Sequence, residues 1–112
     1  MTYLRINAYQ AMWIFVLFDL PTLTATNRKD AAKFRKGLEK DGFIMHQFSV
    51  YKRPCPSLES VELHIKRVVK LLPKEGQVTI MYLTDKQYGK SVTFSKKIQK
   101  NNERIPMQLE IF

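Results

Sequence analysis

The stretch MWIFVLFD at residues 12–19 places seven apolar residues in a row and ends on a lone carboxylate, Asp19. Most of the seven are β-branched or aromatic, which are residue types that favour strands. Successive side chains of a strand point to opposite faces, and here both alternating sets are apolar. The pattern therefore predicts a central strand that is buried on both faces.

A basic helix is predicted to follow this strand. Pro21 and the threonine-rich residues 22–27 end the strand, and Asn27 with Asp30 is expected to cap a helix that runs to Gly42. The side of this helix that should face the core carries Ala31, Phe34 and Leu38. A stripe of lysines lines the opposite side: Lys29, Lys33, Lys36 and Lys40.

The rest of the chain alternates further strands with a second helix. Strand formers fill residues 43–51, and Pro54 and Pro56 are expected to end that segment. Ser57 is predicted to cap a helix whose core face carries Leu58, Val61, Ile65, Val68 and Leu72. Further strands are predicted at residues 78–83, 92–94 and 107–112.

This order of elements predicts an α+β fold, a ferredoxin-like sheet with two helices on one face. The whole chain, residues 1–112, is expected to form a single domain, with residues 1–11 as an N-terminal extension and residues 107–112 as a C-terminal edge strand. The topology requires a chain reversal around His46 and Gln47, although no Gly, Pro or Asn marks a turn there.

A homodimer is predicted from the first strand. Helices cover only one face of such a sheet, yet Trp13, Phe15 and Leu17 are as apolar as the residues between them. A second copy packed sheet against sheet about a two-fold axis would cover the other face. The alternating pattern of residues 107–112 suits a strand added to a sheet edge, either its own or that of the partner.

Composition narrows the class of protein and its partners. The chain has 112 residues and a net charge of +9, an excess that attracts polyanions such as nucleic acid. Its longest apolar run, seven residues, is far shorter than the roughly 20 that a membrane-spanning helix needs, so no membrane partner is expected. Cys55 is the only cysteine and the chain shows no signal peptide, so a cytoplasmic protein is expected.

Asp19 is the sharpest candidate for chemistry, because the end of a central strand holds a functional group rigidly. It either caps the turn before Pro21 or binds a divalent cation, since Mg²⁺ can be held by one or two carboxylates with waters and phosphates. Asp85 is a second carboxylate at a strand end, in a segment that equally suits a turn or a helix start. A general-base role for His46 or a nucleophilic role for Cys55 has little support, because neither has a partner at suitable spacing.

A second basic cluster lies at residues 86–104, where six cations accompany only one anion. Together with the lysine stripe it favours a surface that binds phosphate backbones. No exposed aromatic platform for base stacking is evident, so contact independent of base sequence is expected.

Several segments resemble one family. These are WIFVLFDLPT at 13–22, FRKGL at 34–38, QFSVY at 47–51, and GQV at 76–78 leading to LTDKQ at 83–87. They are similar to CRISPR-associated protein two, the small adaptation subunit, and the resemblance covers residues 12–112. The segment RINAY at 5–9 looks like the branch that accompanies Cas-nine effector systems.

The resemblance implies a ferredoxin-like homodimer that bridges subunits of a partner integrase, Cas-one, and holds spacer-precursor DNA. Members are also described as metal-dependent endonucleases, in which the residue matching Asp19 binds magnesium. Contacts to the nucleic acid backbone map by resemblance to Arg28, Lys29, Lys33, Lys96 and Lys97. Lys36 of the helical stripe and Lys100 of the second basic cluster complete the predicted nucleic-acid surface.

The sequence therefore leads to two hypotheses about function. The first is a structural subunit of the spacer-acquisition complex in antiviral defence. The second is a magnesium-dependent RNase or DNase that acts through the Asp19 pair of a dimer.

Overall fold

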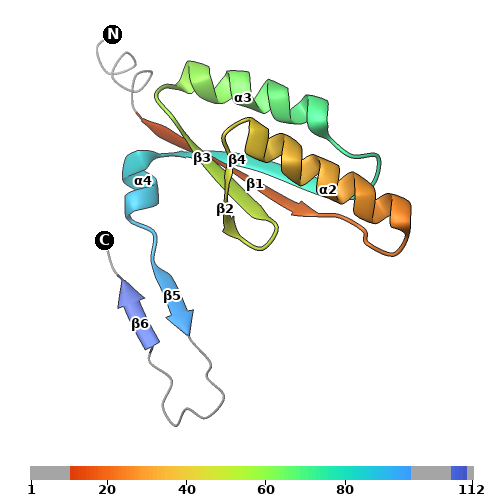
Figure 1. The fold of residues 1–112 in the computed structure, drawn as a ribbon. Coiled ribbons are helices and arrows are strands. Elements are labelled where there is room, and N and C mark those ends of the chain that lie inside the picture. Colours follow the sequence, from red (N-terminus) through yellow and green to blue (C-terminus); the bar gives the residue numbers. More distant parts are fainter. Residues whose placement is uncertain (1–10, 97–106, 111–112) are drawn as a thin grey trace.

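The computed structural model describes residues 11–96 and the backbone of residues 107–110. Four strands form an antiparallel sheet in the order β2-β3-β1-β4, and two helices, α2 and α3, cover one face of it (Figure 1). In chain order these elements are β1 (Met12–Asp19), α2 (Ala25–Lys40), β2 (Ile44–Gln47), β3 (Val50–Cys55), α3 (Leu58–Leu71) and β4 (Gln77–Thr84). The arrangement confirms the predicted α+β, ferredoxin-like fold with two helices on one face.

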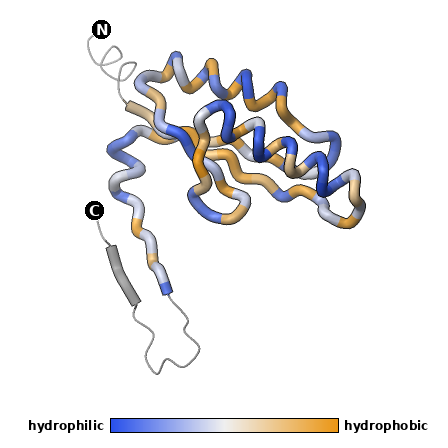
Figure 2. Tube along the Cα trace, viewed as in Figure 1, coloured by the Kyte–Doolittle hydropathy of each residue, from blue (hydrophilic) through white to orange (hydrophobic). Residues whose placement is uncertain are grey.

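The first strand lies at the centre of the sheet, as its apolar character predicts. It pairs with β3 from Met12 opposite Cys55, and with β4 as far as Asp19 opposite Gln77. On the face beneath the helices, Ile14 and Val16 are completely buried. Figure 2 shows apolar residues following this strand and recurring along both helices. The core beneath the helices is completed by residues such as Phe34, Leu38, Phe43, Tyr51, Val61 and Val68.

Both main helices begin at hydroxyl caps. The hydroxyl of Ser57 accepts a hydrogen bond from the backbone N–H of Ser60 at 3.2 Å, which confirms the cap predicted for α3. The cap predicted for α2 was wrong, because Thr24 accepts the bond from the Asn27 N–H at 3.0 Å and the helix therefore starts earlier. Within residues 11–96, no helix is both long enough and apolar enough to cross a membrane.

The reversal between β2 and β3 falls at Phe48 and Ser49, two residues later than predicted. Ser49 adopts φ of 64°, a left-handed conformation that glycine or asparagine would normally mark in the sequence. The Ser49 carbonyl accepts a hydrogen bond from the Phe18 N–H at 3.1 Å. The predicted break at Pro54 was also wrong, because β3 continues to Cys55 alongside β1 after its pairing with β2 has ended at Lys52.

Asp41, directly after α2, ties both helices to the sheet. Its carboxylate accepts hydrogen bonds from His64 Nδ1 at 2.7 Å and from Arg67 at 3.0 Å, both on α3. Its carbonyl accepts another from Arg53 of β3. His64 is 6% exposed, so it has a structural role in the helix packing.

A short helix follows the last strand of the sheet. For this segment the sequence allowed either a turn or a helix start. This helix, α4 (Asp85–Gly89), begins with a capping box between Thr84 and Gln87. Strands β5 (Thr93–Lys96) and β6 (Met107–Glu110) then form a separate two-stranded antiparallel sheet. The predicted C-terminal strand is confirmed over residues 107–110, and its neighbour in this chain is β5. Residues 1–10 of the predicted extension lie outside the described residues.

The face of the sheet opposite the helices is here called the open face, and the residues that the structure describes cover it at one end only. Tyr88 of α4 packs there against Trp13 and Phe15, with ring centroids 4.9 and 5.4 Å apart. Lys52 donates a hydrogen bond to the Tyr88 hydroxyl at 2.7 Å and lies over the Trp13 ring. We expected a second copy of the chain to cover this whole face. That expectation was wrong for Trp13 and Phe15, because Tyr88 of the same chain packs against them. Leu17, farther along the strand, stays half-buried.

Candidate functional site

Asp19 lies exposed at the end of β1, on the open face of the sheet. It lines a shallow depression of about 340 Å³. The other residues of this depression come from β1, the β2–β3 turn, β3 and β4: Leu17, Phe18, Phe48, Ser49, Val50, Gln77 and Thr79. Three neighbouring strands thus surround one carboxylate with a mixed apolar and polar lining.

The backbone around Asp19 is held by a close approach from the loop before β4. Gly76 has φ of 110°, and a Cβ placed on it would lie 2.9 Å from the Asp19 carbonyl oxygen and 2.6 Å from a methyl group of Leu20. Only glycine meets both the conformational and the steric requirement. Arg28 supports the chain beyond Asp19 by donating hydrogen bonds to the carbonyls of Thr22 and Leu23 at 3.0 and 3.3 Å.

Within the described residues, the Asp19 carboxylate accepts no hydrogen bond from a backbone N–H or from a side chain. The alternative role of Asp19 as a turn cap therefore has no support there. A carboxylate is the kind of donor that Mg²⁺ prefers. However, no cluster of three or more His, Cys, Asp or Glu occurs in residues 11–96. One chain thus offers a single ligand of the right chemistry, and two copies meeting at the open face would offer two.

Asp85 has a structural role. Its carboxylate accepts a hydrogen bond from Trp13 Nε1 at 2.6 Å, and its backbone N–H donates to the Ala11 carbonyl at 2.9 Å. These bonds fix α4 to the first residues of β1. The reading of this segment as a helix start is confirmed.

His46 belongs to the aromatic cluster under α4 and not to the depression around Asp19. Its ring packs edge-on against Phe15 at 5.4 Å and against Tyr88 at 6.2 Å. Burial lowers the pKa of His46 below its ordinary value of 6.5, and the nearby charge of Lys52 lowers this pKa further. Because His46 does not line the depression around Asp19, the geometry gives no support to a general-base role for His46 there.

Acidification is expected to destabilise the protein through His46. Because its pKa is lower in the folded state, the unfolded chain binds the proton first, and stability falls as the pH drops below 6.5 towards the folded pKa. Urea unfolding at pH 7.5 and 5.5 should therefore show a smaller loss in His46→Gln than in the unaltered protein. An equal loss in both proteins would show that other groups cause the acid sensitivity.

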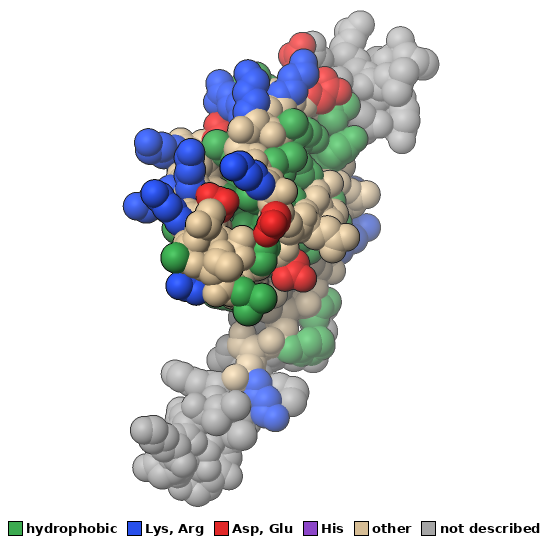
Figure 3. All heavy atoms as spheres, turned by 90° about the vertical axis from the view of Figure 1, so that its right-hand side faces the viewer, with side chains coloured by type: hydrophobic (Ala, Val, Ile, Leu, Met, Phe, Trp, Pro, Cys, Tyr) green, Lys and Arg blue, Asp and Glu red, His purple; other side chains and the backbone are tan. Residues whose placement is uncertain are grey.

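The predicted nucleic-acid residues lie on two separate surfaces. Arg28, Lys29, Lys33 and Lys36 are exposed on α2, and Lys96 is exposed at the end of β5. Lys97 and Lys100 lie outside the described residues. Figure 3 shows Lys and Arg side chains gathered over the helical side of the sheet.

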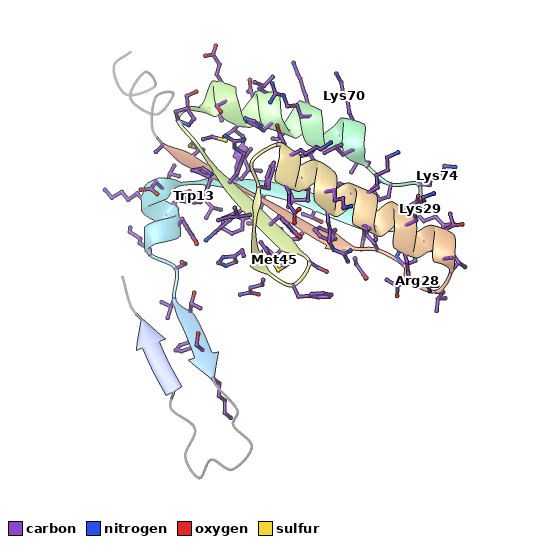
Figure 4. All side chains as sticks on the ribbon, viewed as in Figure 1. Trp13, Arg28, Lys29, Met45, Lys70 and Lys74 are labelled. Atoms are coloured by element: carbon purple, nitrogen blue, oxygen red, sulfur yellow. The ribbon has the colours of Figure 1, made fainter. Side chains whose placement is uncertain are left out.

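Sequence reasoning missed Lys70 at the end of α3 and Lys74 in the loop that follows. Both are exposed, and Figure 4 places them at the same end of the molecule as Arg28 and Lys29. Their spacing of four residues was a usable signal, but their position beside α2 depends on how the helices pack.

The strand order, the strand-end carboxylate and the basic helix define a small ferredoxin-like protein with an exposed carboxylate at the end of its central strand and a basic surface. The chain belongs to the Cas2 family, since the model of the family described as CRISPR associated protein Cas2 matches residues 12–91. This finding confirms the resemblance recognised in the sequence. The assignment to the Cas-nine-associated branch stays a prediction.

Curated relatives match along nearly the whole chain. A CRISPR-associated endoribonuclease Cas2 of Flavobacterium psychrophilum is 46% identical over 98% of this chain and 96% of that protein. The protein of the same name from Parvibaculum lavamentivorans is 43% identical over 90% of this chain and 100% of its own. That of Paracidovorax avenae is 39% identical over 96% of this chain and 99% of its own.

Proposed function

We propose that this chain is a dimeric, DNA-binding subunit of a CRISPR adaptation complex, in which it bridges integrase subunits and holds spacer-precursor DNA. Membership of the Cas2 family supports the adaptation role. The observation that carries the structural role is the open face of the sheet, because no helix in the described part of the chain lies over its Leu17 end.

The open face has the chemistry of a surface that a second copy would cover. Ile44 and Met81 lie on it and are 57% and 45% exposed, and Phe48 at the edge of the depression is 80% exposed. In the register of the sheet, Ile44 pairs with Lys52 and Met81 with Phe15, so these exposed apolar side chains lie at both edges of the face. Exposed apolar surface of this kind marks interaction sites when it adjoins further apolar groups such as those of the depression. A two-fold axis through this face would pair the same patch on both copies and bring the two Asp19 carboxylates to one interface.

Nucleic-acid binding follows from the charge and its placement. The chain has a net charge of +9, and α2 alone carries six Lys and Arg against two acidic residues, on the side of the sheet away from the open face. Phosphate contacts carry no information about base sequence, so binding through this surface should vary little with base sequence.

The test of this function is purification of the tagged chain from its native cell. The expected result is co-purification of the integrase partner together with a dimer of the chain by sedimentation. A chain recovered alone, as a 13.2 kDa species at micromolar concentration, would contradict both the dimer and the complex.

A second candidate activity, phosphodiester cleavage, is supported by the exposed Asp19 depression and by the name endoribonuclease carried by the relatives. Asp19 from each copy would hold Mg²⁺, and the basic helices would hold the nucleic acid backbone. When bound, the metal would polarise the phosphate and activate water. The names of the relatives make RNA the first substrate to test.

A further inference from the structure

A groove runs between α2 and α3 on the side of the molecule away from the open face. It has a volume of about 230 Å³. Lys33 comes from α2, Lys70 from the end of α3, and Lys74 from the next loop (Figure 4 labels the latter two). Leu71 and Pro73 provide an apolar floor, and Asp30 is the one carboxylate that lines the groove.

The packing of the two helices explains why these lysines converge. The helices make a close contact at Gly37, where an added Cβ would lie 2.7 Å from a methyl group of Leu71. Lys33 is one helical turn before Gly37, so it lies on the same side of α2 and faces α3. Lys70 directly precedes Leu71, and the chain then turns at Pro73 and brings Lys74 to the same groove.

The three ammonium groups have no acidic partner in the described part of the chain. Both ion pairs found there use Asp41, so no carboxylate lies within 4.0 Å of Lys33, Lys70 or Lys74. The dipole of α3 favours a cation at its C-terminal end and accounts for Lys70 alone. Lys33 on the other helix and Lys74 outside any helix are not explained by that effect. Three like charges around one groove suit an anionic ligand.

We propose that this groove binds phosphates of a nucleic acid backbone, with Lys33, Lys70 and Lys74 as the phosphate contacts. The apolar floor would contact the sugar carbons and reduce the screening of the charges by water. The inference rests on the proposed nucleic-acid function and adds Lys70 and Lys74 to the binding surface. The groove and the Asp19 depression are connected through the loop before β4. Lys74 lines the groove, and two residues later Gly76 contacts the Asp19 backbone.

The test compares two variants that lose the same charge. Lys70→Gln with Lys74→Gln removes two charges from the α3 side of the groove. The control Lys66→Glu changes the net charge by the same two units at an exposed lysine that does not line the groove. Affinity for a mixed-sequence DNA duplex is measured from 50 to 300 mM salt. Each lost phosphate contact should reduce the slope of log affinity against log salt by about 0.9, so the groove variant should lose about 1.8. At 0.1 M salt this corresponds to a weakening on the order of fiftyfold, and the control should lose less than half of that slope.

The outcomes separate the inference from the function on which it rests. Equal slope changes in the two variants would overturn the groove while leaving nucleic-acid binding in place. No binding by the unaltered protein would overturn both. A groove variant that keeps its duplex affinity but no longer binds polyglutamate would identify a site for an acidic protein segment, which also overturns the proposal. Lys66, Lys70 and Lys74 are all exposed, so circular dichroism should show both variants folded.

Discussion

Asp19→Asn should abolish metal-dependent cleavage of RNA, lowering the rate by at least about a hundredfold, while the protein stays folded. Asparagine has nearly the volume of aspartate but lacks the charge that attracts a divalent cation. The side chain is exposed and makes no hydrogen bond within the described residues, so the substitution breaks no structural contact. The measurement is cleavage of a labelled single-stranded RNA with and without Mg²⁺, beside thermal unfolding of both proteins.

Asp85→Asn is the matched control for this experiment. It makes the same chemical change at a carboxylate that accepts the Trp13 hydrogen bond outside the Asp19 depression. Cleavage should persist in this control. Spacer acquisition in cells should persist in Asp19→Asn as well, if the structural role is independent of cleavage. Cleavage by Asp19→Asn at the unaltered rate would remove Asp19 from the proposed site.

Leu17→Lys should dissociate the proposed dimer. Leu17 lies on the open face at the centre of the sheet, and a two-fold axis would bring two copies of it to the interface. Burying a leucine contributes about 1.5–3 kcal/mol, so losing both copies costs about 3–6 kcal/mol. This loss corresponds to a dimer dissociation constant higher by about two to four powers of ten. Sedimentation velocity across a concentration series measures the change.

Leu23→Lys provides the control, since it introduces the same charge in place of the same residue. Leu23 is 89% exposed in the loop before α2, so this variant should dimerise as the unaltered protein does. A dimer of unchanged affinity in Leu17→Lys would show that the two copies meet elsewhere. Charged replacement of Leu109 separately tests whether the C-terminal strand takes part.

The sequence by itself determined the central strand, the two helices and therefore the class of fold. These features depend on local periodicity: seven apolar residues require burial on both faces, and apolar spacings of three and four define the sides of helices. The position of Asp19 at a strand end was determined in the same way. Hydroxyl caps were readable too, although Thr24 and Asn27 are both good caps and only their local geometry decides between them.

Tertiary structure decided the features that depend on residues distant in the chain. The left-handed Ser49 carries no sequence signal, since only its hairpin neighbours and the bond to Phe18 favour that conformation. Tyr88 covers Trp13 and Phe15 because α4 folds back over the sheet, a contact across more than seventy residues that no local pattern records. The lysine groove likewise exists only because Gly37 lets α2 approach α3 closely enough to bring together cations from two helices and a loop.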